Sequence, residues 1–159
     1  MAVSNFEELC KGYCEIAGVQ APELAEDTHG LTAFHHRIRE VTVTVAKHRS
    51  ATDAAFVIAE FGPVPQGHEA KIWNSLLTAN HELVRQRSGG YSRNPGNHDV
   101  LFQFGFRLDT GSPLDLYRAI EQVVDEAGEW RAAVAALPLP ESVPSRPREL
   151  DHMAGGFTR

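Results

Sequence analysis

The segment from Glu69 to Leu108 constrains the fold more than any other part of this chain. It reads as a long amphipathic helix, two glycines that end the helix, and a β-hairpin. At 100° per residue the helix carries two apolar stripes, which are about 100° apart. The first stripe holds Ile72, Leu76, Ala79 and Leu83, and the second holds Trp73, Leu77 and Val84. One stripe can cover the protein's own sheet, so we expect a second copy of the chain to cover the other.

The length and the charge narrow the possible classes of protein. The 159 residues correspond to one domain, and 21 acidic against 15 basic side chains give a formal net charge of −6. Phosphate binding needs a basic surface, so we expect no nucleic-acid partner. The chain has neither the charged and apolar start of a signal peptide nor a window near the ~18 apolar residues of a membrane span. We therefore expect a cytoplasmic protein that does not insert into a membrane.

The first predicted helix contains both cysteines. Ser4 and Glu7 have the spacing of a capping box, so we expect this helix to begin there. Cys10 and Cys14 are four residues apart, and at that spacing helical side chains run parallel and do not form a disulfide. We expect buried free thiols. No Cys/His cluster at zinc spacing follows them, so the pattern predicts neither a metal nor a cofactor.

The middle of the chain predicts a sheet. Residues 29–49 read as two strands with a break near Arg39 and Glu40, and the alternating valines 41, 43 and 45 mark the second strand. Residues 54–61 form a third strand, and residues 91–93 and 100–108 form the hairpin around a Pro-Gly turn.

A last helix begins at the capping residue Ser112. The order α-β-β-β-α-β-β-α predicts an α+β fold in which a twisted antiparallel sheet packs with helices. We assign this domain to residues 1–137. Residues 138–159 contain four prolines and predict a tail.

Histidines are the strongest candidates for catalytic chemistry. One alternative is a small metal-dependent enzyme that uses His35 or His36 with His29, His48 or Glu60. Neighbouring residues of a strand point to opposite faces, however, and this favours solvated histidines over metal ligands. No nucleophile elbow, phosphate-binding loop or dinucleotide fingerprint occurs in the sequence. We therefore expect a protein that is not an enzyme.

Asn80 is a polar residue within the apolar arc of the long helix. Two interpretations remain open. A hydrogen bond to a neighbouring backbone group is slightly favoured, and the alternative is a polar contact that fixes the register of a helix-to-helix dimer interface.

Several segments resemble one known family. The start FEELCKGYCEIAGV, the strand end FGPVP, the helix core SLLTANHEL and the segment AGEW with Trp130 are similar to the CesT/Tir chaperone family, the class I chaperones of bacterial type III secretion. The residues of the helix core that carry the resemblance are Leu76, Leu77, Ala79 and Asn80. The resemblance covers about residues 6–137, and the histidine-rich strands and the tail depart from it.

The resemblance implies a cytoplasmic homodimer without enzymatic activity. Such a chaperone binds the N-terminal segment of a secreted effector and keeps it competent for secretion without ATP, and the secretion ATPase is a further suggested partner. For the dimer interface we expect Trp73, Leu77, Asn80, Val84 and Phe104. For effector binding we expect Leu31, Phe34, Phe56 and Ile58, which lie on apolar strand faces. A dimeric adaptor module without a secretion client remains a further alternative.

Overall fold

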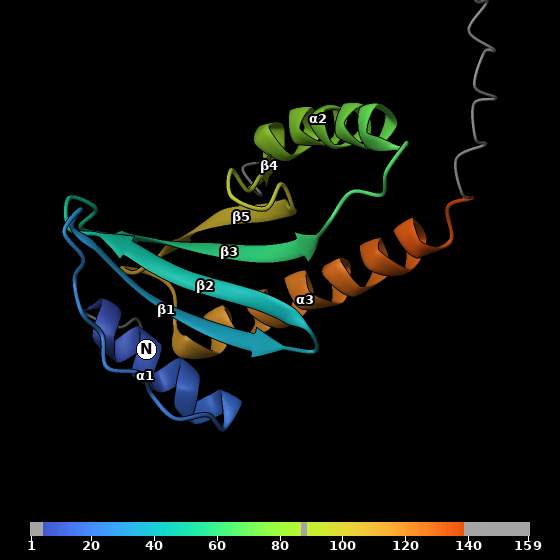
Figure 1. Ribbon diagram of the computed structural model, residues 1–159. Coiled ribbons are helices and arrows are strands. Elements are labelled where there is room, and N and C mark those ends of the chain that lie inside the picture. Colours follow the sequence, from blue (N-terminus) through green and yellow to red (C-terminus); the bar gives the residue numbers. More distant parts are fainter. Residues whose placement is uncertain (1–4, 87–88, 139–159) are drawn as a thin grey trace, which may run out of the picture.

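The computed structural model describes residues 5–86 and 89–138 of the chain (Figure 1). The elements are α1 (Phe6–Ala17), β1 (Leu31–Ile38), β2 (Val41–His48), β3 (Ala54–Gly62), α2 (Glu69–Gln86), β4 (Gly90–Arg93), β5 (Val100–Arg107) and α3 (Pro113–Ala135). This order confirms the predicted α+β fold. The predicted tail lies outside the described residues, except for Pro138.

The five strands form one antiparallel sheet in the order β1-β2-β3-β5-β4. The predicted break between the first two strands is a two-residue turn, in which Arg39 and Glu40 adopt φ angles of 45° and 68°. Both angles are in the left-handed region, which suits the twist of a short hairpin. β5 lies between β3 and β4, so β1 and β4 are the two edge strands of the sheet.

Helices α1 and α3 lie together on one side of the sheet (Figure 1). The hydrophobic core is the layer between these helices and the strands. Alternation along the strands builds it, because Val41, Val43 and Val45 are fully buried while Thr42 and Thr44 are only half-buried. From the helices, Leu9 and Tyr13 of α1 and Leu116, Ile120 and Val124 of α3 are buried in this layer.

The helix starts are set by capping side chains. At α3 the predicted capping residue Ser112 is confirmed, and the structure adds a full capping box, since Ser112 Oγ accepts the Asp115 N–H and Asp115 accepts the Ser112 N–H. At α1 the expected cap Ser4 lies outside the described residues, and the N-cap is Asn5 instead. Its Oδ1 accepts the backbone N–H of Glu8 at 2.7 Å. Both residue types suit this position because a short polar side chain reaches back to the first free N–H groups.

Helix α2 lies apart from α1 and α3 and packs on β4 (Figure 1). Leu76 of the first apolar stripe is buried against the core. In the second stripe Leu77 is 63% exposed and Val84 is 69% exposed. A single subunit therefore buries Leu76 of the first stripe, leaves the other residues of that stripe half-buried, and leaves two large residues of the second stripe in contact with water.

Both cysteines are free and buried, as the sequence predicts. Burial raises the pKa of Cys10 to about 12, and it also raises the pKa of Cys14. We expect neither thiol to react with a disulfide reagent at pH 8 in the native protein, and both to react at once in denaturant. Because the folded pKa lies above the unfolded one, the stability that the protonated thiols contribute is complete below about pH 9 and is lost as the pH rises toward 12. Thiol titration, with and without denaturant, measures the reactivity of the two cysteines directly.

Candidate functional site

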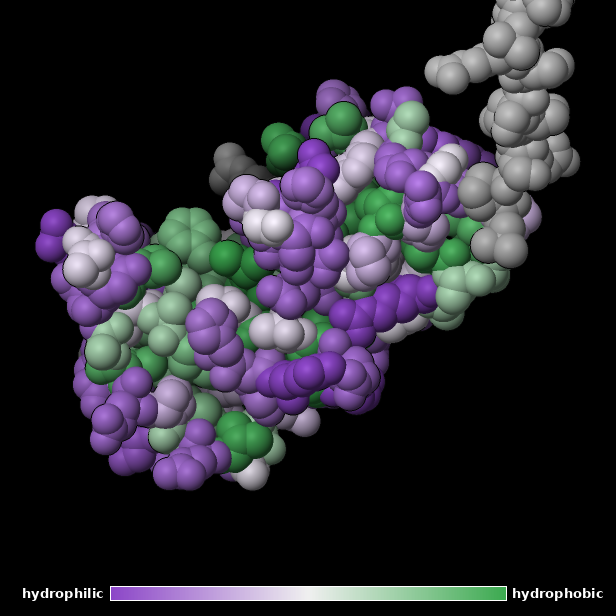
Figure 2. Space-filling model, viewed as in Figure 1, coloured by the Kyte–Doolittle hydropathy of each residue, from purple (hydrophilic) through white to green (hydrophobic). Residues whose placement is uncertain are grey.

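The side of the sheet opposite α1 and α3 carries apolar residues that no described helix covers. We call this side the outer face and define it by the strand residues that alternate with the core residues. They are Leu31, Ala33, His35, Thr44, Ala46, Phe56, Ile58, Gln103 and Gly105. Figure 2 shows hydrophobic side chains reaching the surface over the strands that α2 leaves open.

Phe56 is the most exposed apolar side chain of the outer face, at 47%. The strand register places it in one row with Ala33, Ala46 and Gly105. All three neighbours are small, and a side chain at Gly105 would meet nothing within 4 Å. Ala46 is itself buried at 3% exposure, so the open space beside Phe56 lies on the Gly105 side, where an apolar side chain of a partner could pack against its ring.

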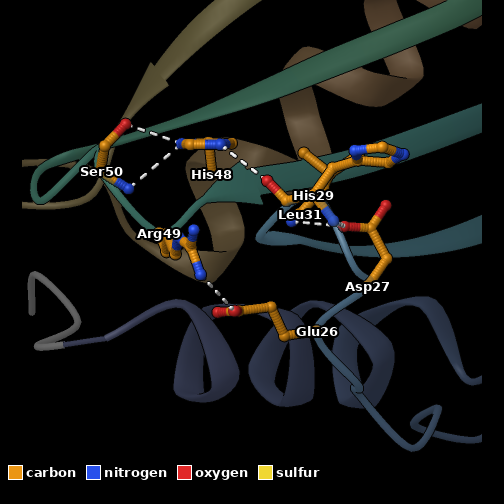
Figure 3. A network of polar contacts seen from close by, with 7 residues as sticks. All are labelled: Glu26, Asp27, His29, Leu31, His48, Arg49 and Ser50. Carbon is orange, nitrogen blue, oxygen red and sulfur yellow. Dashed lines mark hydrogen bonds and ion pairs between the residues drawn. The ribbon is translucent and has the colours of Figure 1, made fainter.

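The β1 edge of the sheet is only partly closed. Leu31 donates its N–H to Asp27 Oδ1 at 2.8 Å, and its carbonyl accepts the Asp27 N–H at 2.9 Å (Figure 3). Both groups of Leu31 thus point away from β2. Alternation gives the same direction to Ala33, His35 and Arg37. An isolated antiparallel bridge between Glu26 and Thr32 extends the cover of this edge as far as Ala33, so within the described residues the outward backbone groups without a backbone partner are those of His35 and Arg37. These residues are an open strand edge beside the outer face.

Three of the four residues predicted to bind an effector share one face. Leu31, Phe56 and Ile58 all lie on the outer face, and Leu31 is 36% exposed. Phe34 lies on the opposite face, where it is only 4% exposed and its ring is 5.8 Å from that of Tyr13. The structure therefore does not bring Phe34 together with the other three.

The residues predicted for the dimer interface lie in different environments. Leu77 and Val84 are exposed on α2, and Trp73 is half-buried. Phe104 is half-buried on β5, in a cleft of about 400 Å³ between α2 and α3. Asn80 exchanges two hydrogen bonds with the backbone of Tyr91 in β4, which is the slightly favoured interpretation of this residue.

The histidines of β1 and β2 form separate hydrogen bonds and do not converge on one point. His35 Nδ1 bonds Thr44 Oγ1 on the outer face at 2.7 Å, whereas His36 Nδ1 bonds the hydroxyl of Tyr13 on the core side at 2.9 Å. His48 uses both ring nitrogens, one with Ser50 and one with the carbonyl of His29 (Figure 3). Within residues 5–86 and 89–138 no group of three His, Cys, Asp or Glu side chains could hold a metal ion.

A family model decides the classification. The model of the Tir chaperone protein (CesT) family matches residues 15–131. The chain belongs to this family. The match spans the strands and α2, and it includes the outer face and the open edge of β1. No match was found among curated proteins.

Solved structures share the fold of this CesT-family chain at low identity. The ExsC-ExsE complex matches with a TM-score of 0.65 and 14% identity, over 80% of this chain and 92% of that one. The HopA1-SchA chaperone-effector complex matches with a TM-score of 0.59 and 14% identity, over 78% and 91%. The Yersinia pestis type III secretion chaperone SycH, in complex with a fragment of YscM2, matches with a TM-score of 0.53 and 12% identity, over 79% and 99%.

Two features of this family member are not apparent from its sequence pattern. Arg131 of α3 donates to the backbone carbonyls of Phe61, Glu60 and Glu40, at 2.6, 2.9 and 2.9 Å. A groove of about 660 Å³ lies beside it, lined among others by Trp130.

In the part of the chain that the structure describes, no helix is both long enough and apolar enough to cross a membrane.

Proposed function

We propose that this CesT-family protein is a cytoplasmic type III secretion chaperone that binds the N-terminal segment of an effector. It acts as a homodimer and keeps that segment competent for secretion without ATP, before a handover in which the secretion ATPase is a further partner. Family membership and the solved complexes with the same fold support this proposal.

The observation that carries the proposal is the open β1 edge beside an uncovered apolar face. An extended segment can pair with the outward backbone groups of His35 and Arg37, beyond the bridge between Glu26 and Thr32. Every second side chain of that segment then lies on the outer-face side of the sheet, the side of Leu31. Phe56 is three strand spacings, about 14 Å, from such a strand, so the segment contacts it where it continues across the outer face. Backbone pairing gives affinity for many sequences, and the apolar contacts select among them.

Co-expression with the polypeptide encoded next to this gene tests the function. We expect a complex that co-purifies and that protects a segment near the partner's N-terminus from limited proteolysis. A partner that resists proteolysis along its whole length, or one that does not co-purify, would contradict a chaperone that binds an N-terminal segment. A dimeric adaptor would bind a partner without leaving an extended protected segment.

Single charges on the outer face test the binding surface. We expect Phe56→Glu to lower the affinity for the co-purified partner at least tenfold, because a carboxylate would be buried without a counter-charge in the complex. The free subunit should keep its stability within about 0.5 kcal/mol, since the Phe56 side chain is already 47% exposed. Isothermal titration and thermal unfolding provide the two measurements.

Leu114→Glu is the matched control for this substitution. Leu114 is 42% exposed at the start of α3, away from the outer face, so its replacement should leave the affinity unchanged. Equal losses for both variants would show that the apolar outer face does not form the binding surface.

A further inference from the structure

The side chain of Asn80 takes the place of a neighbouring strand at the β4 edge. Its Nδ2 donates to the carbonyl of Tyr91 at 2.9 Å, and its Oδ1 accepts the N–H of Tyr91 at 2.6 Å. A side-chain amide has one donor and one acceptor side by side, as a peptide unit does. Asn80 therefore makes the pair of hydrogen bonds that a residue of an added antiparallel strand would make.

This pair lies at the centre of a short strand. β4 has only four residues, and Tyr91 is opposite Phe102 of β5. The two groups of Tyr91 that bond Asn80 point away from β5, so in β4 the outward groups belong to Tyr91 and to Arg93 at the strand end. Because the N–H and the carbonyl of Tyr91 are bonded to Asn80, an incoming strand finds no two consecutive outward residues of β4 with free backbone groups.

The local sequence holds the amide in place. Asn80 is half-buried on α2, and the Gly90 position before Tyr91 gives it room, since a Cβ at Gly90 would stand 3.4 Å from Asn80 Oδ1. The amide thus lies directly against the backbone of β4. Exposed strand edges invite pairing with other chains, and covering an edge prevents it.

We infer that Asn80 guards the β4 edge, so that strand addition is confined to the β1 edge. The two edge strands of the sheet differ in whether their outward backbone groups are available to an added strand. At β1 the outward groups of His35 and Arg37, two consecutive outward residues, are open, whereas at β4 the central outward pair is occupied. The choice of edge then depends on one side chain of α2. The β1 half of this inference rests on the proposed function, and the guarding of β4 does not.

Paramagnetic labelling tests which edge accepts a strand. The probe is a synthetic peptide of alternating valine and threonine with lysines at both ends and a nitroxide at one end. With the native chain, the label should broaden the amide signals of His35 and Arg37 and leave those of Tyr91 and Arg93 sharp. With Asn80→Ala, the signals of Tyr91 and Arg93 should broaden as well. Asn74→Ala, an exposed position on the same helix, is the control and should behave like the native chain.

Hydrogen exchange provides a second readout that needs no peptide. We expect the Tyr91 amide to exchange at least tenfold faster in Asn80→Ala, while the buried Val57 amide of β3 reports that the fold is intact. Asn80→Leu has the branched side-chain shape of asparagine and neither a donor nor an acceptor, and it replaces the alanine variant if that variant does not fold. It should give the same faster exchange of the Tyr91 amide and the same broadening at Tyr91 and Arg93.

The outcomes separate the two proposals. Broadening at β4 in the native chain, or none at β4 in the variant, would overturn the guarding role of Asn80. Broadening at β4 in the variant without any at β1 would support that role and contradict strand addition at β1, which belongs to the proposed function.

Discussion

Replacement of Arg131 by methionine is expected to lower the free energy of unfolding by about 3 kcal/mol. The guanidinium donates to three backbone carbonyls, those of Phe61, Glu60 and Glu40, and thereby ties α3 to the ends of β2 and β3. Hydrogen bonds from a charged group contribute more than neutral ones, and methionine keeps the aliphatic contacts without any donor. The loss corresponds to a fall in Tm of roughly 6 to 12 °C for a chain of this size.

Chemical denaturation at a fixed protein concentration measures the effect of Arg131→Met. Arg118→Met is the control on the same helix, because Arg118 is exposed, and it should change stability by less than about 0.5 kcal/mol. Arg131→Lys should recover only part of the loss, since one ammonium cannot reach three carbonyls in the fixed fork of a guanidinium. A methionine variant as stable as the native chain would show that the three bonds do not stabilise the fold.

The sequence predicts the elements well because their signals are local. Alternation of valines with threonines in residues 41–45 identifies β2, and the serine, proline and aspartate of residues 112–115 identify the start of α3. The two stripes of α2 follow from helical periodicity alone, and in the structure the first is the more covered of the two, with Leu76 buried and its other residues half-buried. Such signals need only neighbours within one or two turns.

The contacts of Arg131 and the faces of β1 are less apparent from the sequence. Arg131 bonds residues 70 and 91 positions away, so no local pattern indicates its partners. The sequence does indicate that Leu31 and Phe34 lie on opposite faces of β1. The two residues are an odd number of positions apart, and in a regular strand such residues point to opposite faces. Leu31, His35 and His36 obey the same parity, which places only the first two on the outer face.

The double substitution of Leu77 and Val84 by glutamate is expected to convert the proposed homodimer into a folded monomer. In one subunit these side chains are 63% and 69% exposed, so in the monomer the new carboxylates remain in water at little cost. In a dimer built on this stripe they would be buried without counter-charges, which costs several kcal/mol for each carboxylate. Association should therefore weaken by at least a thousandfold while the free energy of unfolding of the monomer hardly changes. Trp73 is a poorer test, because it is half-buried against the core of its own subunit.

Sedimentation equilibrium at micromolar concentration distinguishes the two states by mass. The double substitution of Ser75 and Thr78 by glutamate adds the same two charges away from the second stripe of α2, where both side chains are exposed, and should leave the dimer intact. The comparison matters because the chain has a net charge of −6, and added acidic residues weaken association in a general way as well. If the control with glutamate at positions 75 and 78 dissociated the protein as strongly as the substitution of Leu77 and Val84, repulsion and not burial would be the cause. If the native chain were itself a monomer under these conditions, the second stripe of α2 would have some other partner than a twin subunit.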